Sequence, residues 1–232
     1  MALVEFVGQV ATIITLFSFL TGIPICRNIQ LSGSTDKFSS LPFLVGNVCG
    51  YLWLRYGLML GDPTMTFVNI VGFTLQSLYL IWFYIYTFPK SKINRAIIAV
   101  LSMLLFVHLY IKYTNEPEYF VGLMACLSSL FFSISPMPLV FEVIRTKCTE
   151  QLPFSLIASS FLVTLLWFIY GSLIGDAFVQ IPNGLGACIY GVQLSLFTIY
   201  PSKRNIQILS YSLKQTEKLL ITNVSPMIEM NI

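Results

Sequence analysis

Charge is scarce in this sequence. Only 13 Lys and Arg and 10 Asp and Glu occur among 232 residues, whereas about 25% of the residues of a soluble domain are charged. Hydrophobic residues make up 56% of the chain. Water could not keep such a composition dispersed, so an ordinary soluble protein is excluded and an integral membrane protein is predicted. The net charge of +3 is too small to indicate a nucleic-acid partner.

Metal ligands and catalytic groups are equally scarce. The sequence contains one histidine, His108, and no CxxC motif or other close pair of cysteines. The cysteines are interpreted as free thiols packed in apolar surroundings. No set of nucleophile, base and orienting group can be recognised at any depth of the predicted spans. We therefore expect no metal site, no cofactor and no enzymatic activity.

Long apolar stretches are abundant instead. A helix that crosses a bilayer needs about 20 such residues, and a helix satisfies the backbone hydrogen bonds that lipid cannot provide. The predicted spans are residues 6–26, 42–60, 64–88, 95–111, 119–144, 154–175 and 178–200. The polar tail, residues 203–232, is predicted to be exposed to solvent and disordered.

Positively charged residues predict the orientation in the membrane. Eleven Lys and Arg fall on one side of the predicted topology and only Lys112 falls on the other, while Arg55 lies inside a span. Cytoplasmic loops carry the excess of such residues. The N-terminus is therefore predicted to be extracellular or lumenal and the C-terminus cytosolic, in a plasma membrane or a Golgi membrane.

One ten-residue pattern of the sequence occurs twice. Residues 53–62 read WLRYGLMLGD and residues 167–176 read WFIYGSLIGD, so Trp, Tyr, two Gly and Asp recur at a shift of 114 residues. The agreement continues on both flanks without a gap, for example between Pro24 and Pro138. The first three spans and the last three are therefore predicted to be two copies of one three-helix unit.

The fourth predicted span has no counterpart. A three-span unit ends on the side opposite to its start, so a second copy in the same orientation needs one more crossing. This pattern predicts an all-α integral membrane protein with seven transmembrane helices, two parallel three-helix bundles joined by a linker helix. The predicted segments are 1–90 for the first repeat, 91–114 for the linker helix, 115–202 for the second repeat and 203–232 for the tail.

Four residues are predicted to meet near the axis that relates the two copies. Asn69 and Asn183 lie at matching depth within their spans, where an amide needs partners for its oxygen and two hydrogens. They could bond one helix to another. Their pairing with Trp53 and Trp167 favours a substrate-binding site, because amides bind hydroxyls and an indole packs against the apolar face of a sugar ring.

Residues that bend or end helices lie at the ends of several spans. Proline removes a backbone donor and kinks a helix. These positions either fix the shape or act as hinges and gates for two rocking halves; they are Gly22, Pro24, Pro42, Pro136 and Pro153. Acids and histidines are scarce within the spans, which favours passive movement over ion-coupled transport.

These segments together resemble the SWEET family of sugar transporters, with its MtN3/saliva-type repeat, and animal members in particular. The resemblance covers about residues 1–202. In the first half it rests on GSTDKFSSLPF at 33–43, WLRYG at 53–57 and VNIVGFTLQSLY at 68–79. In the second half it rests on SPMPLVFEVIRTKCTEQLPF at 135–154, WFIYG at 167–171 and IPNGLG at 181–186.

The resemblance implies passive, bidirectional transport of a small neutral sugar, glucose or another monosaccharide, by uncoupled alternating access. It also implies that the two Asn and two Trp line the sugar pocket, and that the chain assembles into homo-oligomers in lipid. Four prolines act in alternating access in the family. Pro42, Pro136 and Pro153 match three of them, whereas Gly22 occupies the fourth place and Pro24 lies two residues later.

Two other classes of membrane protein fit the sequence less well. A related amino-acid carrier of the PQ-loop type would have a buried acid near the axis and a Pro-Gln pair, but Gln151 is followed by Leu152 and no Pro-Gln occurs. A seven-helix receptor would have no reason to contain an internal repeat.

Overall fold

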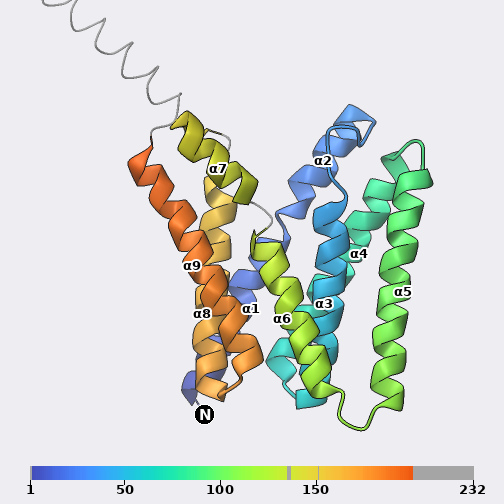
Figure 1. The fold of residues 1–232 in the computed structure, drawn as a ribbon, viewed down its shortest axis with the longest axis vertical. Coiled ribbons are helices and arrows are strands. Elements are labelled where there is room, and N and C mark those ends of the chain that lie inside the picture. The colour runs from blue at the N-terminus through green and yellow to red at the C-terminus, as the bar shows by residue number, and fades with distance from the viewer. Residues whose placement is uncertain (1, 135–136, 151, 201–232) are drawn as a thin grey trace, which may run out of the picture. The chain divides into compact units, whose positions relative to one another are not determined.

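The computed structural model describes residues 2–134, 137–150 and 152–200, and within these residues all regular structure is helical (Figure 1). The helices are α1 (Ala2–Phe19), α2 (Gly22–Ser32), α3 (Leu41–Leu60), α4 (Pro63–Tyr86), α5 (Ser91–Tyr113), α6 (Glu118–Ile134), α7 (Met137–Thr146), α8 (Phe154–Ile174) and α9 (Ala177–Ile199). The predicted tail lies outside the described residues, as does Pro136.

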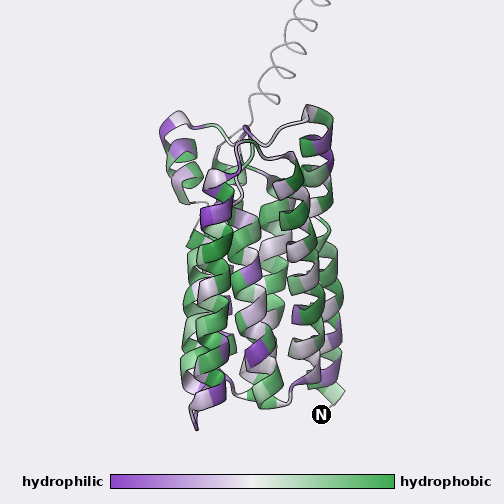
Figure 2. Cartoon of the chain, turned by 90° about the vertical axis from the view of Figure 1, so that its right-hand side faces the viewer, coloured by the Kyte–Doolittle hydropathy of each residue, from purple (hydrophilic) through white to green (hydrophobic). Residues whose placement is uncertain are grey.

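The predicted helical membrane fold is confirmed. Six helical stretches are long and apolar enough to cross a membrane, namely Ala2–Ser32, Leu41–Leu60, Pro63–Tyr86, Ser91–Tyr113, Glu118–Thr146 and Phe154–Ile174. The seventh predicted span corresponds to α9, which has 23 residues but is less apolar because it contains Gln180, Asn183 and Gln193. Apolar residues cover most of the helix surfaces, and hydrophilic residues gather toward the helix ends (Figure 2).

The first predicted span is broken into α1 and α2, and Pro24 explains the break. Proline has no N–H to donate to the carbonyl four residues earlier, and here the carbonyl of Leu20 accepts from Ile23 instead, at 3.0 Å. The freed carbonyl of Phe19 accepts from the hydroxyl of Tyr79 at 3.0 Å. Gly22 is required at this place, because a Cβ would lie 2.3 Å from the Tyr79 ring.

The repeated pattern forms the same turn in both copies. Gly61 and Gly175 end α3 and α8 in the left-handed conformation, with φ values of 66° and 72°, a conformation that glycine adopts without steric cost. Asp62 then caps α4, because its Oδ1 accepts from the backbone N–H of Met65 at 2.9 Å. Asp176 caps α9 through the N–H groups of Phe178 and Val179, at 2.8 and 3.2 Å. The duplication in the sequence is thus a duplication of structure.

The chain forms two compact units. The first unit comprises residues 1–135 and 155–191, and therefore contains α1 to α6, α8 and the part of α9 that ends at Gly191. Within this unit α1 and α6 run in one direction and α3 and α8 in the other (Figure 1), as two parallel copies require. The boundaries drawn between the repeats from the sequence remain a prediction.

The core of the first unit combines residues of both repeats. Its buried members come from α1, α3, α4, α5, α6, α8 and α9, and include Leu52, Tyr56, Val121, Trp167 and Tyr170. The outward-facing residues are apolar too, and on α5 Leu101, Leu105 and Phe106 are 59%, 58% and 59% exposed. Apolar residues on both sides of a helix are typical of helices surrounded by lipid.

The second unit comprises residues 136–154 and 192–232. In its described part, Val140 and Val143 of α7 are buried, and the rings of Phe154 and Phe197 meet edge to face with centroids 5.1 Å apart. The hydroxyl of Thr149 donates to the carbonyl of Tyr200 at 3.3 Å.

We expect the close approach of α8 and α9 to depend on Gly171. A Cβ there would lie 2.7 Å from the backbone nitrogen of Gln180, whereas a Cβ at Gly191 would lie 3.5 Å from the ring of Phe161, in ordinary contact. Gly171→Ala should therefore destabilise the protein by about 1–3 kcal/mol through overpacking. Gly191→Ala is the matched control and should be neutral or slightly stabilising. Thermal unfolding in detergent measures both, and equal midpoints would contradict the prediction.

Candidate functional site

A cavity of ≈ 400 Å³ lies within the first unit, inside the range of about 300–1,000 Å³ that is usual for small-molecule sites. Residues of α1, α2, α3, α4, α6, α8 and α9 line it, so both repeats contribute. It extends from the two Trp side chains to Pro42 and Leu156, which lie at the beginnings of α3 and α8. None of the described residues that line it carries a charge.

The two tryptophans line the part of the cavity that is nearer to the N-terminus. Trp53 and Trp167 are each only 8% exposed. The indole N–H of Trp53 donates to the hydroxyl of Ser129 on α6 at 2.8 Å, and that of Trp167 donates to the hydroxyl of Thr15 on α1 at 3.0 Å. Ser129 and Thr15 are themselves 114 residues apart. Each indole is therefore held by the other repeat, and its ring position is fixed.

The two asparagines have the same local geometry. The Nδ2 of Asn69 donates to the carbonyl of Met65 at 2.8 Å, and the Nδ2 of Asn183 donates to the carbonyl of Val179 at 2.7 Å. This bond orients each amide, because the amide oxygen in that place would face a carbonyl oxygen. Both side chains are half-buried and line the cavity. The amide oxygen and the second N–H of each remain available to a ligand.

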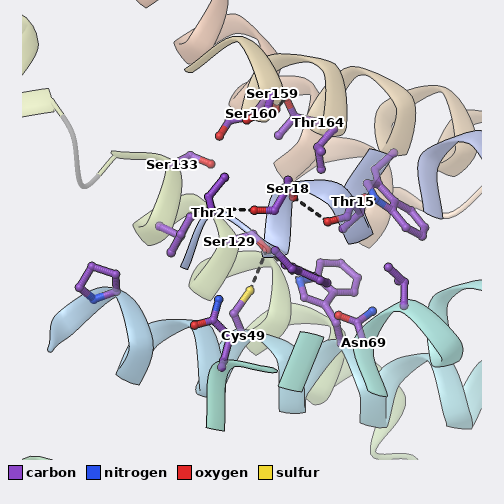
Figure 3. Close-up of a pocket in the computed structure, with 18 of the residues that line it drawn as sticks. Thr15, Ser18, Thr21, Cys49, Asn69, Ser129, Ser133, Ser159, Ser160 and Thr164 are labelled. Carbon is purple, nitrogen blue, oxygen red and sulfur yellow. Dashed lines mark hydrogen bonds between the residues drawn. The ribbon is translucent and has the colours of Figure 1, made fainter. Parts of the chain in front are cut away.

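Hydroxyl groups cover one wall of the cavity. Figure 3 shows serines and threonines of α1, α6 and α8 on one side, and Cys49 and Asn69 of α3 and α4 on the other. Several of these hydroxyls donate to carbonyls of their own helix, as Ser18 does to Thr15 at 2.7 Å and Ser159 to Leu156 at 2.9 Å. A hydroxyl used in this way keeps lone pairs that can accept from a ligand.

Two hydrogen bonds cross between the repeats on the N-terminal side of the tryptophans. The hydroxyl of Tyr56 donates to Oδ2 of Asp176 at 2.9 Å, and the hydroxyl of Tyr170 donates to Oδ2 of Asp62 at 2.7 Å. We call these the crossed Tyr–Asp pairs. Both tyrosines are 4% exposed, and each ring meets the neighbouring Trp of its own helix edge to face.

Small residues make room for these rings. A Cβ at Gly8 would lie 3.0 Å from the ring of Tyr170, and a Cβ at Gly122 would lie 2.8 Å from the ring of Tyr56. Gly8 and Gly122 are again separated by 114 residues. Packed rings and crossed hydrogen bonds therefore close the first unit at this end, while the cavity extends toward the other.

All four residues predicted to bind substrate line this one cavity, as Trp53, Asn69, Trp167 and Asn183. Their binding of a ligand remains a prediction. The residues predicted to act as hinges are more dispersed. Gly22 and Pro42 line the cavity, Pro24 lies within α2, and Pro153 immediately precedes α8.

Neither the hydroxyl-rich wall nor the crossed Tyr–Asp pairs are among the site residues predicted from the sequence. The repeated pattern did contain a signal for the pairs, because Tyr56 and Asp62 recur as Tyr170 and Asp176. It could not show that each tyrosine reaches the aspartate of the other copy. Other serines of the wall carry no such signal, since Ser133, for example, has Phe19 as its counterpart, whereas Ser129 does have a hydroxyl counterpart in Thr15.

Two like-oriented helical repeats around an uncharged, polar cavity in an apolar, membrane-spanning chain define a membrane transporter. Comparisons with known proteins identify the family. The model of the family described as "Sugar efflux transporter for intercellular exchange" matches twice, over residues 5–91 and 119–205. This chain belongs to that family, the SWEET family, whose relatives are named as transporters and not as enzymes.

Individual relatives agree with this assignment. The chain is 39% identical to Sugar transporter SWEET1 of Drosophila pseudoobscura pseudoobscura, over 86% of this chain and 90% of the relative. It is 33% identical to Bidirectional sugar transporter SWEET2 of Arabidopsis thaliana, over 83% and 85%. The solved structure of a eukaryotic SWEET transporter at 3.7 Å resolution superposes with a TM-score of 0.77 and 28% identity, covering 84% of this chain and 95% of that one.

The crossed pairs predict unequal effects of two substitutions. Asp176→Ala removes the cap of α9 and leaves the Tyr56 hydroxyl buried without an acceptor, so the free energy of unfolding should fall by about 2–4 kcal/mol. Tyr56→Phe removes the hydroxyl but keeps the cap, and should cost about 1–2 kcal/mol. Thermal unfolding in detergent distinguishes them, with Ser172→Ala as a control on the exposed side of α8. Equal losses would contradict the double role of Asp176.

Proposed function

We propose that this chain moves a small neutral sugar, glucose or another monosaccharide, across a membrane in both directions by facilitated diffusion. The names of the relatives support sugar as the substrate class. The single observation that carries the proposal is the uncharged cavity in which one Asn and one Trp of each repeat meet.

The chemistry of the cavity suits a sugar ring. Each amide has an oxygen that can accept from one hydroxyl and an N–H that can donate to the next. The fixed indoles offer aromatic surface to the apolar C–H face of a ring. Because Trp53 and Trp167 are both held across the repeats, they cannot swing aside independently. This restriction favours one ring at their level over two.

The absence of charge argues against an amino-acid substrate. A zwitterion would need an opposite charge for its ammonium and its carboxylate, and none of the described lining residues carries one. The same absence favours uncoupled transport, since ion-coupled carriers use acidic or His side chains at this depth.

The difference between the two ends of the first unit supports alternating access as the proposed mechanism. The crossed Tyr–Asp pairs close the N-terminal end, so the opposite state requires both pairs to separate. The break between α1 and α2 at Gly22 and Pro24 and the start of α3 at Pro42 are the proposed hinge and gate positions, together with Pro136 and Pro153. The distribution of Lys and Arg predicts that the closed end faces the extracellular or lumenal side. The membrane is predicted to be a plasma membrane or a Golgi membrane. Assembly into homo-oligomers remains a prediction from the resemblance.

Uptake of radiolabelled glucose by the purified chain in liposomes tests the proposal directly. We expect uptake that saturates, that runs down the glucose gradient and that does not change when a proton gradient is imposed, because no acidic residue and no histidine is among the described residues that line the cavity. Dependence on the proton gradient would overturn the uncoupled mechanism. Absence of glucose uptake with retained folding would overturn the substrate.

Asn69→Ala and Asn183→Ala should each reduce glucose uptake at least tenfold, because each removes both groups that bind a hydroxyl. Asn47→Ala is the matched control. Its amide is used within the first repeat, since Nδ2 donates to the carbonyl of Phe43 and Oδ1 accepts from Ser77, and it does not line the cavity. This control should lower the unfolding temperature and leave uptake per folded protein within twofold. Normal uptake by both cavity variants would assign Asn69 and Asn183 to helix packing.

A further inference from the structure

Arg55 is a charged residue within a membrane-spanning helix, and the cavity does not use it. It lies on α3, five residues before the helix ends at Leu60, which is about 7–8 Å along the helix axis. The guanidinium of an arginine is always charged. A charge at this depth is costly unless a partner compensates it.

Arg55 has no such partner within the part of the chain that the structure describes. Its Nε–H is buried and makes no hydrogen bond, and no described acidic side chain forms an ion pair with it. Asp62 lies one helical turn beyond but is already used, because Oδ1 caps α4 and Oδ2 accepts from Tyr170. Lys112, the other positive residue predicted on this side of the membrane, lies over the ring of Tyr113, with Nζ 5.5 Å from the centroid. The charge of Arg55 is therefore not compensated by these residues.

The position of Arg55 on its helix opens it to lipid beside α5. Arg55 shares one face of α3 with Leu52 and Met59, which lie three residues before it and four residues after it. Those two residues pack in the core together with Val107 of α5, and α3 and α5 lie side by side (Figure 1). Leu58, three residues after Arg55, is 53% exposed. The half-buried Arg55 thus lies between the buried face of α3 and its lipid-facing surface.

The second repeat shows that packing does not require a charge at this position. The counterpart of Arg55 is Ile169, which is 37% exposed, although the neighbouring Trp, Tyr and Gly recur unchanged. An apolar side chain that faces lipid therefore satisfies the same place in the same three-helix unit. The linker helix α5 has no counterpart either, so a site formed beside it occurs once in the chain.

We propose that Arg55 binds the phosphate of an anionic phospholipid, at the contact between α3 and α5 and in the leaflet predicted to be extracellular or lumenal. The planar guanidinium presents its N–H groups in a fork that matches two phosphate oxygens. An arginine near the end of a membrane helix lays its apolar stem along the helix and keeps its charge at the level of the head groups. Exposed apolar residues such as Leu58 offer a surface to the acyl chains. The inference does not depend on which substrate the cavity binds.

Thermal unfolding of the purified full chain in a neutral detergent, with and without dioleoylphosphatidylglycerol, tests the inference. At a lipid concentration about ten times its Kd, the unfolding midpoint of the wild type should rise by about 3–6 °C. Arg55→Met keeps an unbranched apolar stem and removes the phosphate-binding fork, so its midpoint should not rise. Without lipid, its midpoint should equal or exceed that of the wild type, because an uncompensated charge has been removed.

Two further variants and two further ligands make the test specific. Arg55→Lys keeps the charge without the fork and should retain only part of the rise. Arg27→Met removes a charge from an exposed position of α2 and should retain the full rise, which separates a site from a general attraction between charges. With the wild type, dioleoylglycerol, which has the same acyl chains and no phosphate, should produce no rise. Inorganic phosphate should produce none either.

Equal rises in the wild type and in Arg55→Met would overturn the inference, and so would an equal loss of the rise in Arg27→Met. A full rise with dioleoylglycerol or with inorganic phosphate would exclude a phospholipid as the specific ligand. A clear loss of stability of Arg55→Met in lipid-free detergent would show that the guanidinium already has a partner within the protein, which also contradicts the inference. The proposed function would survive all these results, because glucose uptake tests it separately.

Discussion

The crossed Tyr–Asp pairs are the constraint on which the arrangement of the first unit depends. Each aspartate uses one oxygen to cap the helix that follows and the other to accept from a tyrosine of the other repeat. The cap fixes where the carboxylate lies, and the buried tyrosine must reach it or leave a hydroxyl unpaired. Local helix chemistry thereby determines how the two copies meet.

Similar reciprocal contacts between the two repeats are also made around the N-terminal half of the cavity. Indole N–H groups reach serine or threonine hydroxyls of the opposite first helix, and glycines of those helices receive the tyrosine rings. Further along, the symmetry is lost, because Phe19 and Ser133 occupy equivalent places. In this duplicated chain the closed end is therefore symmetric, whereas the part of the cavity that leads to it is lined differently by the two repeats.

Most of the fold could be predicted from the sequence, because a bilayer leaves few choices. The lengths of the apolar stretches predict the membrane spans, and the gapless repeat predicts two copies of a three-helix unit with a linker helix between them. The break after α1 was harder to predict, since Pro24 alone does not show that Tyr79 supplies the donor for the freed carbonyl. The Asn and Trp positions followed from symmetry. The hydroxyl wall did not, because serine in an apolar helix usually only satisfies its own backbone.

The crossed pairs also bear on how easily the closed end could open. A buried hydrogen bond contributes only about 0.5–1.5 kcal/mol net, because water replaces it once the groups are exposed. Separating Tyr56 from Asp176 and Tyr170 from Asp62 would wet all four groups, so the two bonds together favour the closed end by about 1–3 kcal/mol. A bias of this size keeps a minor open state populated at roughly 1–15%. For the facilitated diffusion proposed above, larger ionic locks would favour one state too strongly, because the gradient of the substrate would be the only driving force.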